Sequence, residues 1–287
     1  MTIKGLNPGM RSNIDVNGIN DLLGPGGGSK LVARNAEAAI KVETGMKGVK
    51  IMNLMVSGGT EAKNIGIHFA GATDNGMLSN IIGINLHTGV KIEQAKNMQI
   101  VNCWVCELPN SIELIGGENI VVKNCQLGAQ PTGITCKVQE VNKLSFINNQ
   151  VYPDGRENLV LDACNNCVIE GNNFKSYYNG ILVLNGNDNT VNKNIFWLTG
   201  AVQNQLLDHG DDFGIINVKG NNNMVTSNSL SCEWAYAGAV TVNAVQGTGN
   251  VFKNCFVDNL ESYRVFLVNA QTEVSNCVSS DKVSIVE

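Results

Sequence analysis

Short apolar runs bounded by glycine, asparagine or aspartate recur along this chain. Eight of them read GVKIE, SIELI, GITCKV, NLVLD, GILVL, GIINV, AVTVN and VFLVN. Runs of this length, rich in β-branched and aliphatic residues, predict β-strands with a turn at each end. No stretch keeps the 3,4-spacing of apolar residues that an amphipathic helix needs for more than a turn or two. The pattern therefore predicts an all-β protein.

A longer phrase repeats together with these strands. Residues 97–105 read NMQIVNCWV, and residues 119–127, twenty-two positions later, read NIVVKNCQL. Weaker copies align on an asparagine at intervals of 22–34 residues, at Asn53, Asn80, Asn102, Asn124, Asn148, Asn172, Asn194, Asn228, Asn254 and Asn276. A period in this range indicates a repeat architecture. With two or three short strands per repeat and no helix, it predicts a parallel β-helix of about ten coils.

The repeated asparagine has a structural explanation. In a stack of coils, an amide at the same corner of every coil can donate a hydrogen bond to one neighbour and accept one from the other. Asparagine also tolerates the left-handed backbone conformation that tight corners require. The sequence therefore predicts an asparagine ladder along one corner.

Composition limits the classes of partner. The 287 residues are 43% hydrophobic and 16% charged, and the period runs through without a linker, so we expect one β-helix domain over residues 1–287. The net charge of −5 and the absence of a Lys/Arg cluster argue against nucleic acid and anionic membranes as partners. No apolar run approaches the length of a membrane span, and the first residues, MTIKGLNPGM, do not form a signal peptide.

The nine cysteines include two CxxC pairs, Cys103/Cys106 and Cys164/Cys167. Four cysteines follow the repeated asparagine directly, at Cys103, Cys125, Cys255 and Cys277. A column of like residues in a stack favours small buried side chains over disulfides or zinc ligands. We expect no metal and no cofactor, and free thiols favour a reducing compartment such as the cytoplasm.

Functional candidates lie where the period changes, because insertions in a solenoid map to loops on one face. The longest interval, between Asn194 and Asn228, contains FWLTGAVQNQLLDHGDDFG. Its acidic cluster is either an acid/base or cation-binding group or an exposed loop, and consists of Asp208, His209, Asp211 and Asp212.

Four loops, VCELPNS, GAQPTG, VYPDGR and KSYYNG, fall at similar places in consecutive repeats. Loops that share a register stack beside one another, which would align the side chains of Glu107, Glu113, Asp154, Arg156, Tyr177 and Tyr178. Carboxylates, a guanidinium and aromatic rings along a groove are typical of carbohydrate binding.

Several of these segments resemble one enzyme family in collinear order. They are SIELIGG, LGAQPTGIT, VYPDGRENLVLDACNNCVIEGNNF, SYYNGILVLNG and DDFGIINVKGNNNMVTSN. They are similar to motifs of the inulin fructotransferases and the related difructose dianhydride hydrolases. The resemblance implies a right-handed, pectate-lyase-like β-helix, a homotrimer, and a fructan or dianhydride substrate. It also implies that this chain begins inside the family alignment, without the N-terminal cap region.

The resemblance also implies roles for individual residues. The family's Gly-Pro-Asp-Gly corner has Thr132 in place of aspartate, and the place of the glutamate about ten residues on falls at about Asn142, with Glu140 the nearest carboxylate. The candidate catalytic carboxyls are therefore Glu140, Asp154 and Glu113. Candidate substrate-binding residues are Arg156, Tyr178, Asn179, Thr132 and His209, together with Asp208, Asp211 and Asp212, which could reach across from a neighbouring subunit.

Three functions stay open at this point. The first is a carbohydrate-active enzyme that transfers or hydrolyses fructosyl groups with the help of carboxylates. The second is a non-catalytic sugar-binding or structural trimer that has lost the catalytic pair, because threonine cannot replace an ionisable carboxyl. The third is another β-helix chemistry such as a calcium-dependent pectate lyase, favoured only by the acidic cluster.

Overall fold

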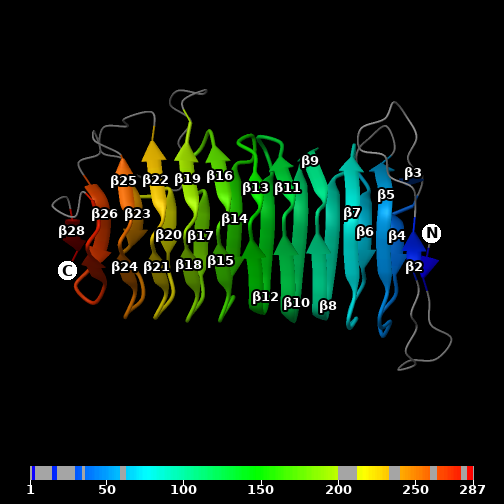
Figure 1. The fold of residues 1–287 in the computed structure, drawn as a ribbon, viewed down its shortest axis with the longest axis horizontal. Helices are drawn as coiled ribbons and strands as arrows, with labels where there is room; N and C mark the ends of the chain where they lie inside the picture. The colour runs from blue at the N-terminus through cyan, green and yellow to red at the C-terminus, as the bar shows by residue number, and fades with distance from the viewer. Residues whose placement is uncertain are drawn as a thin grey trace.

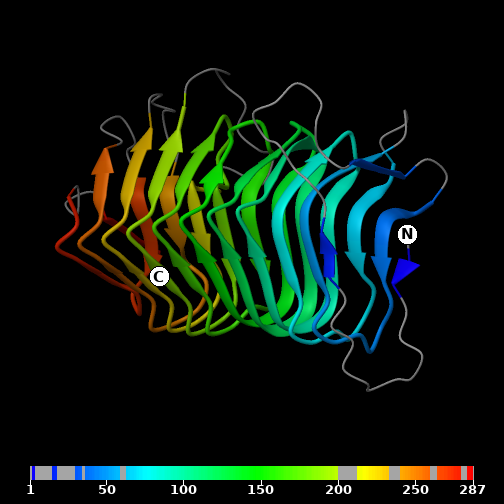
Figure 2. The same cartoon turned by 45° about the vertical axis from the view of Figure 1, so that its right-hand side comes forward.

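The chain winds into a parallel β-helix, which confirms the predicted fold (Figures 1 and 2). The structure, a computed structural model, describes residues 2–3, 15–17, 30–33, 36–58, 63–199, 212–232, 240–258, 264–278 and 283–286. Within these ranges every regular element is a strand. Across the same residues, no helix is long and apolar enough to cross a membrane.

The strands form three faces, which we call A, B and C. Face A contains β1 (Thr2–Ile3), β4 (Ala38–Val42), β6 (Ile65–Phe69), the first parts of β8 (Thr88–Val101), β10 (Asn110–Lys123) and β12 (Ile134–Ile147), then β14 (Glu157–Asp162), β17 (Leu182–Asn185), β20 (Ile216–Val218), β23 (Val240–Ala244), β26 (Arg264–Asn269) and β28 (Val283–Val286). Face B contains β2 (Asp15–Asn17), the first parts of β5 (Lys50–Gly58) and β7 (Met77–Ile84), the second parts of β8, β10 and β12, then β15 (Val168–Glu170), β18 (Thr190–Asn192), β21 (Met224–Thr226), β24 (Val251–Lys253) and β27 (Glu273–Ser275).

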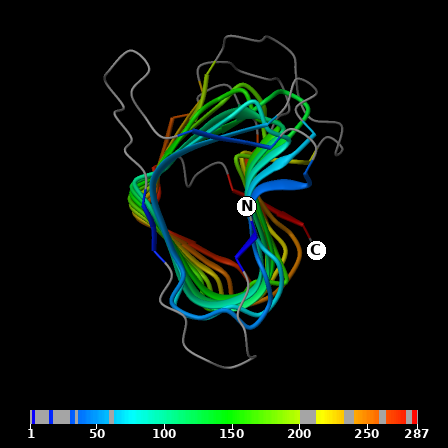
Figure 3. The same cartoon turned by 90° about the vertical axis from the view of Figure 1, so that its right-hand side faces the viewer.

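Face C completes each coil and leads through a longer corner back to face A. It contains β3 (Lys30–Ala33), the second parts of β5 and β7, β9 (Trp104–Leu108), β11 (Gln126–Ala129), β13 (Gln150–Val151), β16 (Asn173–Ser176), β19 (Ile195–Leu198), β22 (Ser229–Cys232) and β25 (Phe256–Asp258). Seen down the long axis, the coils superpose and enclose one core (Figure 3). The phenyl rings of Phe146, Phe174 and Phe196 stack in it, with centroids 6.0 and 5.0 Å apart.

The repeated asparagines occupy two neighbouring columns at the corner between faces B and C, which differs from the single ladder that the sequence predicts. Asn102, Asn124 and Asn148 adopt a left-handed φ of 54–56°. The next residue in each coil points inward, and in four coils it is an asparagine, as in Asn149 and Asn172. The repeated asparagine of the sequence moves to the inner column after Asn148, because Gly171, Lys193 and Ser227 take the left-handed position in the next three coils.

The inner column is a buried ladder formed by Asn149, Asn172, Asn194 and Asn228. Each of the first three amides donates to the carboxamide oxygen of the next at 2.9–3.0 Å. In other coils the same column holds buried cysteines, including Cys103 and Cys125, as the sequence predicts. A second buried ladder, Asn189, Asn223 and Asn250, follows the corner between faces A and B.

Candidate functional site

The four loops that share a register in the sequence also stack in space. They follow β9, β11, β13 and β16, whose first residues pair in the order Trp104, Gln126, Gln150 and Asn173. All four loops therefore lie at the corner that joins face C to face A, which we call the C–A corner.

A pocket of about 260 Å³ opens on face C beside this corner. We call it the corner pocket; its lining residues are Trp104, Cys106, Glu107, Gly128, Ala129, Tyr152 and Asp154. They come from three consecutive coils. Two carboxylates and two aromatic side chains thus share one concave site, a combination that binds and orients sugar hydroxyls and ring faces.

A β-bulge shapes one wall of the corner pocket. Leu127 pairs with Val105, but Ala129 pairs with Leu108, so that Cys106 and Glu107 lie opposite the single residue between Leu127 and Ala129. Glu107 has a φ of 63°, a left-handed conformation that is uncommon for glutamate. Bulges of this kind redirect a side chain, and strained residues of this kind are frequent at functional sites.

Gly128 and Tyr152 form the opposite side of the corner pocket. A Cβ atom at Gly128 would lie 3.0 Å from the Cβ atom of Tyr152 and 3.7 Å from the Sγ atom of Cys106, so a larger residue would occupy part of the pocket. The Tyr152 hydroxyl donates to the Oε1 atom of Gln126 at 3.0 Å and holds the ring in place. Tyr152 remains 40% exposed, which leaves its ring accessible to a ligand.

The thiol in the corner pocket does not act as a nucleophile at neutral pH. Burial, and then the charge of Glu107, raise the pKa of Cys106 to about 12. A thiol with this pKa stays protonated, and only the thiolate is strongly nucleophilic. The candidate acid and base groups of the pocket are therefore the side chains of Glu107 and Asp154.

The structure separates the three carboxyls that the sequence nominates as catalytic. Asp154 lines the corner pocket, before β14 begins. Glu140 is exposed at the corner between faces A and B, since its neighbour Gln139 pairs with Asp162, the last residue of β14. The six residues of β14 span about 20 Å, whereas two carboxyls acting on one glycosidic bond lie about 5 to 10 Å apart. Within one chain, Glu140 and Asp154 do not form such a pair.

Four of the predicted substrate-binding residues lie at the C–A corner. Thr132 is exposed, Arg156 lies beside the buried Glu157 with Nε and Oε2 3.9 Å apart, and Tyr178 is half-buried. Asn179 is buried, and its amide donates to the backbone oxygen of Phe213 at 2.8 Å. Its described contact is therefore structural.

The acidic cluster is only partly described. Asp208, His209 and Asp211 lie outside the described residues. Asp212 accepts a hydrogen bond from Arg264 at 2.5 Å and borders a second pocket, of about 250 Å³, on face A. This second pocket is lined by Asp212, Phe213, Asn217, Lys219, Asn243, Val245 and Gln246. Asp212 stands two coils beyond Asp154 along the C–A corner, so their backbones are about 10 Å apart along the axis, and the two residues line different pockets.

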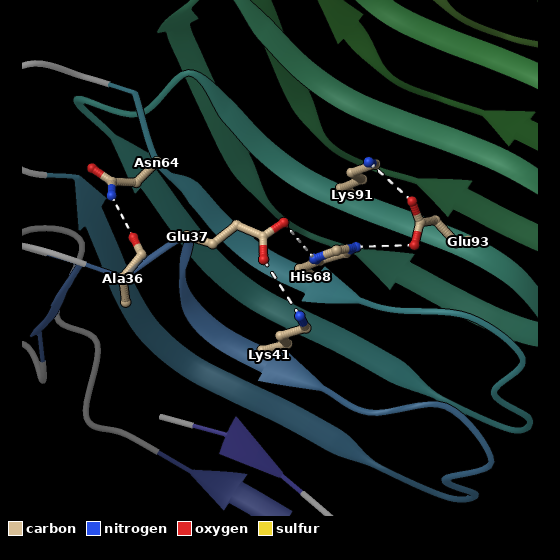
Figure 4. A network of polar contacts seen from close by, with 7 residues as sticks. All are labelled: Ala36, Glu37, Lys41, Asn64, His68, Lys91 and Glu93. Carbon is tan, nitrogen blue, oxygen red and sulfur yellow. Dashed lines mark hydrogen bonds and ion pairs between the residues drawn. The ribbon is translucent and has the colours of Figure 1, made fainter.

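The predicted alignment of Glu113 with the corner loops is wrong, because Glu113 lies within β10 on face A, where it pairs in register with Lys91 and Lys137. Lys91 belongs to a charged network that also contains Glu37, Lys41, His68 and Glu93 (Figure 4). The Nε2 atom of the buried His68 lies 3.1 Å from Glu93, whose other oxygen lies 2.9 Å from Lys91. Three coils are joined by this network.

We expect the network to stabilise the fold in a pH-dependent way. Burial raises the pKa of Glu93, but hydrogen bonds from Lys91 and His68 outweigh it and hold the pKa below its usual 4.5. A carboxyl with a lowered folded-state pKa contributes stability above its unfolded pKa and loses it as the pH falls. Urea unfolding should therefore show Glu93→Gln less stable than wild type at neutral pH, with the difference shrinking below about pH 4.5. Glu170→Gln, which removes a carboxylate paired with the exposed Lys193, is the control; a constant difference for Glu93→Gln at every pH would refute the expectation.

The aromatic residues of the corner pocket were not nominated from the sequence. Trp104 immediately follows the phrase Asn102–Cys103 and precedes the buried Val105. Strand alternation therefore places it on the outer surface. The available signal in the sequence was a tryptophan at a position that the next three coils fill with glutamine or asparagine.

The chain matches one protein-family model, and its fold is similar to those of several solved structures. A family model described as "Periplasmic copper-binding protein (NosD)" matches residues 87–274. The crystal structure of DFA-IIIase from Arthrobacter chlorophenolicus A6 without its lid is 19% identical, with a TM-score of 0.79 over 96% of this chain and 81% of that chain. Its complex with GF2 is 20% identical, with a TM-score of 0.73 over 88% and 69%, and its complex with DFA-III is 19% identical, with a TM-score of 0.67 over 88% and 72%.

No curated protein sequence matches the chain. The solved structures agree with the family resemblance that the motifs indicate, and at these identities they establish the parallel β-helix fold.

Proposed function

The chain belongs to the family described as periplasmic copper-binding protein (NosD). From its β-helix fold and the lining of its corner pocket, we propose that it is a carbohydrate-active protein whose corner pocket takes a fructan-type oligosaccharide. The observation that carries the proposal is the convergence of Glu107, Asp154, Trp104 and Tyr152 on one pocket. Complexes of the structurally similar DFA-IIIase with GF2 and DFA-III support the choice of substrate class.

The proposed reaction follows the glycosidic template. One of the two carboxyls, Glu107 or Asp154, protonates the oxygen of the leaving group, while the other stabilises or attacks the anomeric carbon. Water, or a hydroxyl of the neighbouring fructosyl unit, then completes the displacement, which gives hydrolysis or intramolecular transfer. Trp104 and Tyr152 hold the sugar ring, and Arg156 and Tyr178 bind hydroxyls from the adjoining loops. In this scheme the pocket carboxyls take over the role of the family's aspartate, whose position holds Thr132 in this chain.

Copper is the metal in the family's description, and it prefers cysteine, methionine and histidine ligands. The eight cysteine side chains that the structure describes are buried. His68 is engaged with Glu93 at 3.1 Å. Within the described ranges, no three His, Cys, Asp or Glu side chains gather into a group that could hold a metal ion. The described His, Cys, Asp and Glu side chains therefore do not form a copper centre, and the proposed reaction uses no copper.

A homotrimer is the assembly we propose. On face B a column of uncharged outward side chains, Val168, Thr190, Met224 and Val251, runs along the coils, and Met224 is 49% exposed. Packing three such faces around an axis would bury this column. Sedimentation velocity at micromolar concentration should give three times the 30.7 kDa chain mass; a monomer would refute this assembly.

The function is tested by incubating the protein separately with inulin, GF2 and difructose dianhydride, followed by carbohydrate chromatography. We expect a dianhydride or free difructose as product. Binding detected by calorimetry without any product would favour the second function, a non-catalytic sugar-binding homologue. Neither product nor binding would overturn the proposal.

A further inference from the structure

Large aromatic residues recur on the outer surface of face C at every second coil. Trp104 lies on β9, Tyr152 directly follows β13, Trp197 lies on β19 and Phe256 lies on β25. The row that starts at Trp104 continues through Gln126, Gln150, Asn173, Ile195 and Ser229 to Phe256. Tyr152 and Trp197 lie two residues beyond this row on their coils, so the four rings form two adjacent columns on face C. These seven coils stand side by side in Figure 1.

The spacing of these rings has a chemical meaning. Neighbouring strands lie about 4.8 Å apart, so rings on every second coil are separated by about 10 Å along the axis. This distance is close to the length of two sugar units in an extended chain. Six coil steps from Trp104 to Phe256 make a surface about 30 Å long.

The positions between the rings carry hydrogen-bonding groups. Gln126 and Gln150 are exposed, and Asn173 and Lys175 are half-buried on the same face. The Lys175 ammonium lies 4.9 Å from the centroid of the Trp197 ring. Alternating ring faces and amides suit a polymer that offers apolar ring faces and many hydroxyls.

We propose that face C is a binding track for a linear polysaccharide, which it delivers to the corner pocket. Trp104 and Tyr152 belong to both the track and the corner pocket, so the two surfaces are continuous. Phe256 is 51% exposed, and the half-buried Trp197 is steadied by Lys175. The inference rests on the proposed function and adds that the substrate is a polymer that occupies several coils at once.

The test compares ligands of different length. Inulin fractions of increasing chain length, and GF2 as the short ligand, are titrated by calorimetry into wild type and into Trp197→Ala and Phe256→Ala. In wild type the affinity should rise with chain length and level off once the track is filled. Each variant should bind long inulin about three- to tenfold more weakly, as expected for one lost ring contact, and bind GF2 unchanged. Ile285→Ala, which removes a 61% exposed apolar side chain from face A, is the control and should bind both ligands as wild type does.

The outcomes separate this inference from the proposed function. Unchanged inulin affinity in both track variants, or an equal loss for GF2 and inulin, would overturn the track. A change in sedimentation without a change in binding would also overturn it and would assign Trp197 and Phe256 to contacts between copies of the chain. Length-dependent binding of inulin without turnover would support the track while the catalytic proposal fails.

Discussion

Replacing Asp154 with asparagine is expected to lower the rate of product formation by about 10²- to 10⁴-fold, the usual contribution of a positioned acid or base. The substitution keeps the shape of the side chain and removes only its ionisable group. Because Asp154 borders the corner pocket at its exposed edge, the fold and the affinity for GF2 should be nearly unchanged. Glu107→Gln should cause a loss of similar size. The rate is measured by chromatography under saturating substrate.

The control for Asp154→Asn is Asp188→Asn, a matched change at an exposed left-handed position on the corner between faces A and B. It should leave the rate unchanged. Full activity in both Asp154→Asn and Glu107→Gln would exclude the corner pocket as the reaction site. Glu113 and Glu140 would then be the remaining candidate catalytic carboxyls. Activity lost only together with the ability to bind GF2 would show that the carboxylates bind sugar and do not catalyse.

The second large effect concerns the buried asparagine ladder. Asn172 donates to Asn194 at 2.9 Å and to the backbone oxygen of Phe146 at 2.8 Å, and it accepts from the backbone and side chain of Asn149. Asn172→Ala leaves several of these buried groups without a partner, and each lost partner costs about 1 to 3 kcal/mol. We expect the free energy of unfolding, measured with urea, to fall by about 3 to 5 kcal/mol.

Asn221→Ala provides the comparison. Asn221 belongs to an outer column with Asn187 and is exposed, so water can replace its hydrogen bonds. Its effect should stay below about 1 kcal/mol. Equal effects at Asn172 and Asn221 would show that the inner ladder is not a special source of stability.

Some of the functional surface was accessible from sequence. The register of the four corner loops followed from the repeat, since each loop begins three or four residues after a repeated asparagine. That register correctly placed Glu107 and Asp154 at the C–A corner. Glu140 was nominated by its distance from Thr132 along the family motif, and distance along the chain does not show that a whole strand of face A lies between them.

The pattern of short strands and the repeat interval determined the parallel β-helix, because every coil must pair its backbone with the next and only a regular period allows this. The same pattern determined which side chains fill the core, including the column of cysteines at Cys103 and Cys125. The tertiary structure alone decided which of two adjacent asparagines faces inward, because a corner contains both a left-handed residue and an inward one. The tertiary structure alone also decided that a pocket opens between coils, where the chain bulges at Glu107 and Gly128 has no side chain. Both depend on contacts between residues of different coils, which no single repeat contains.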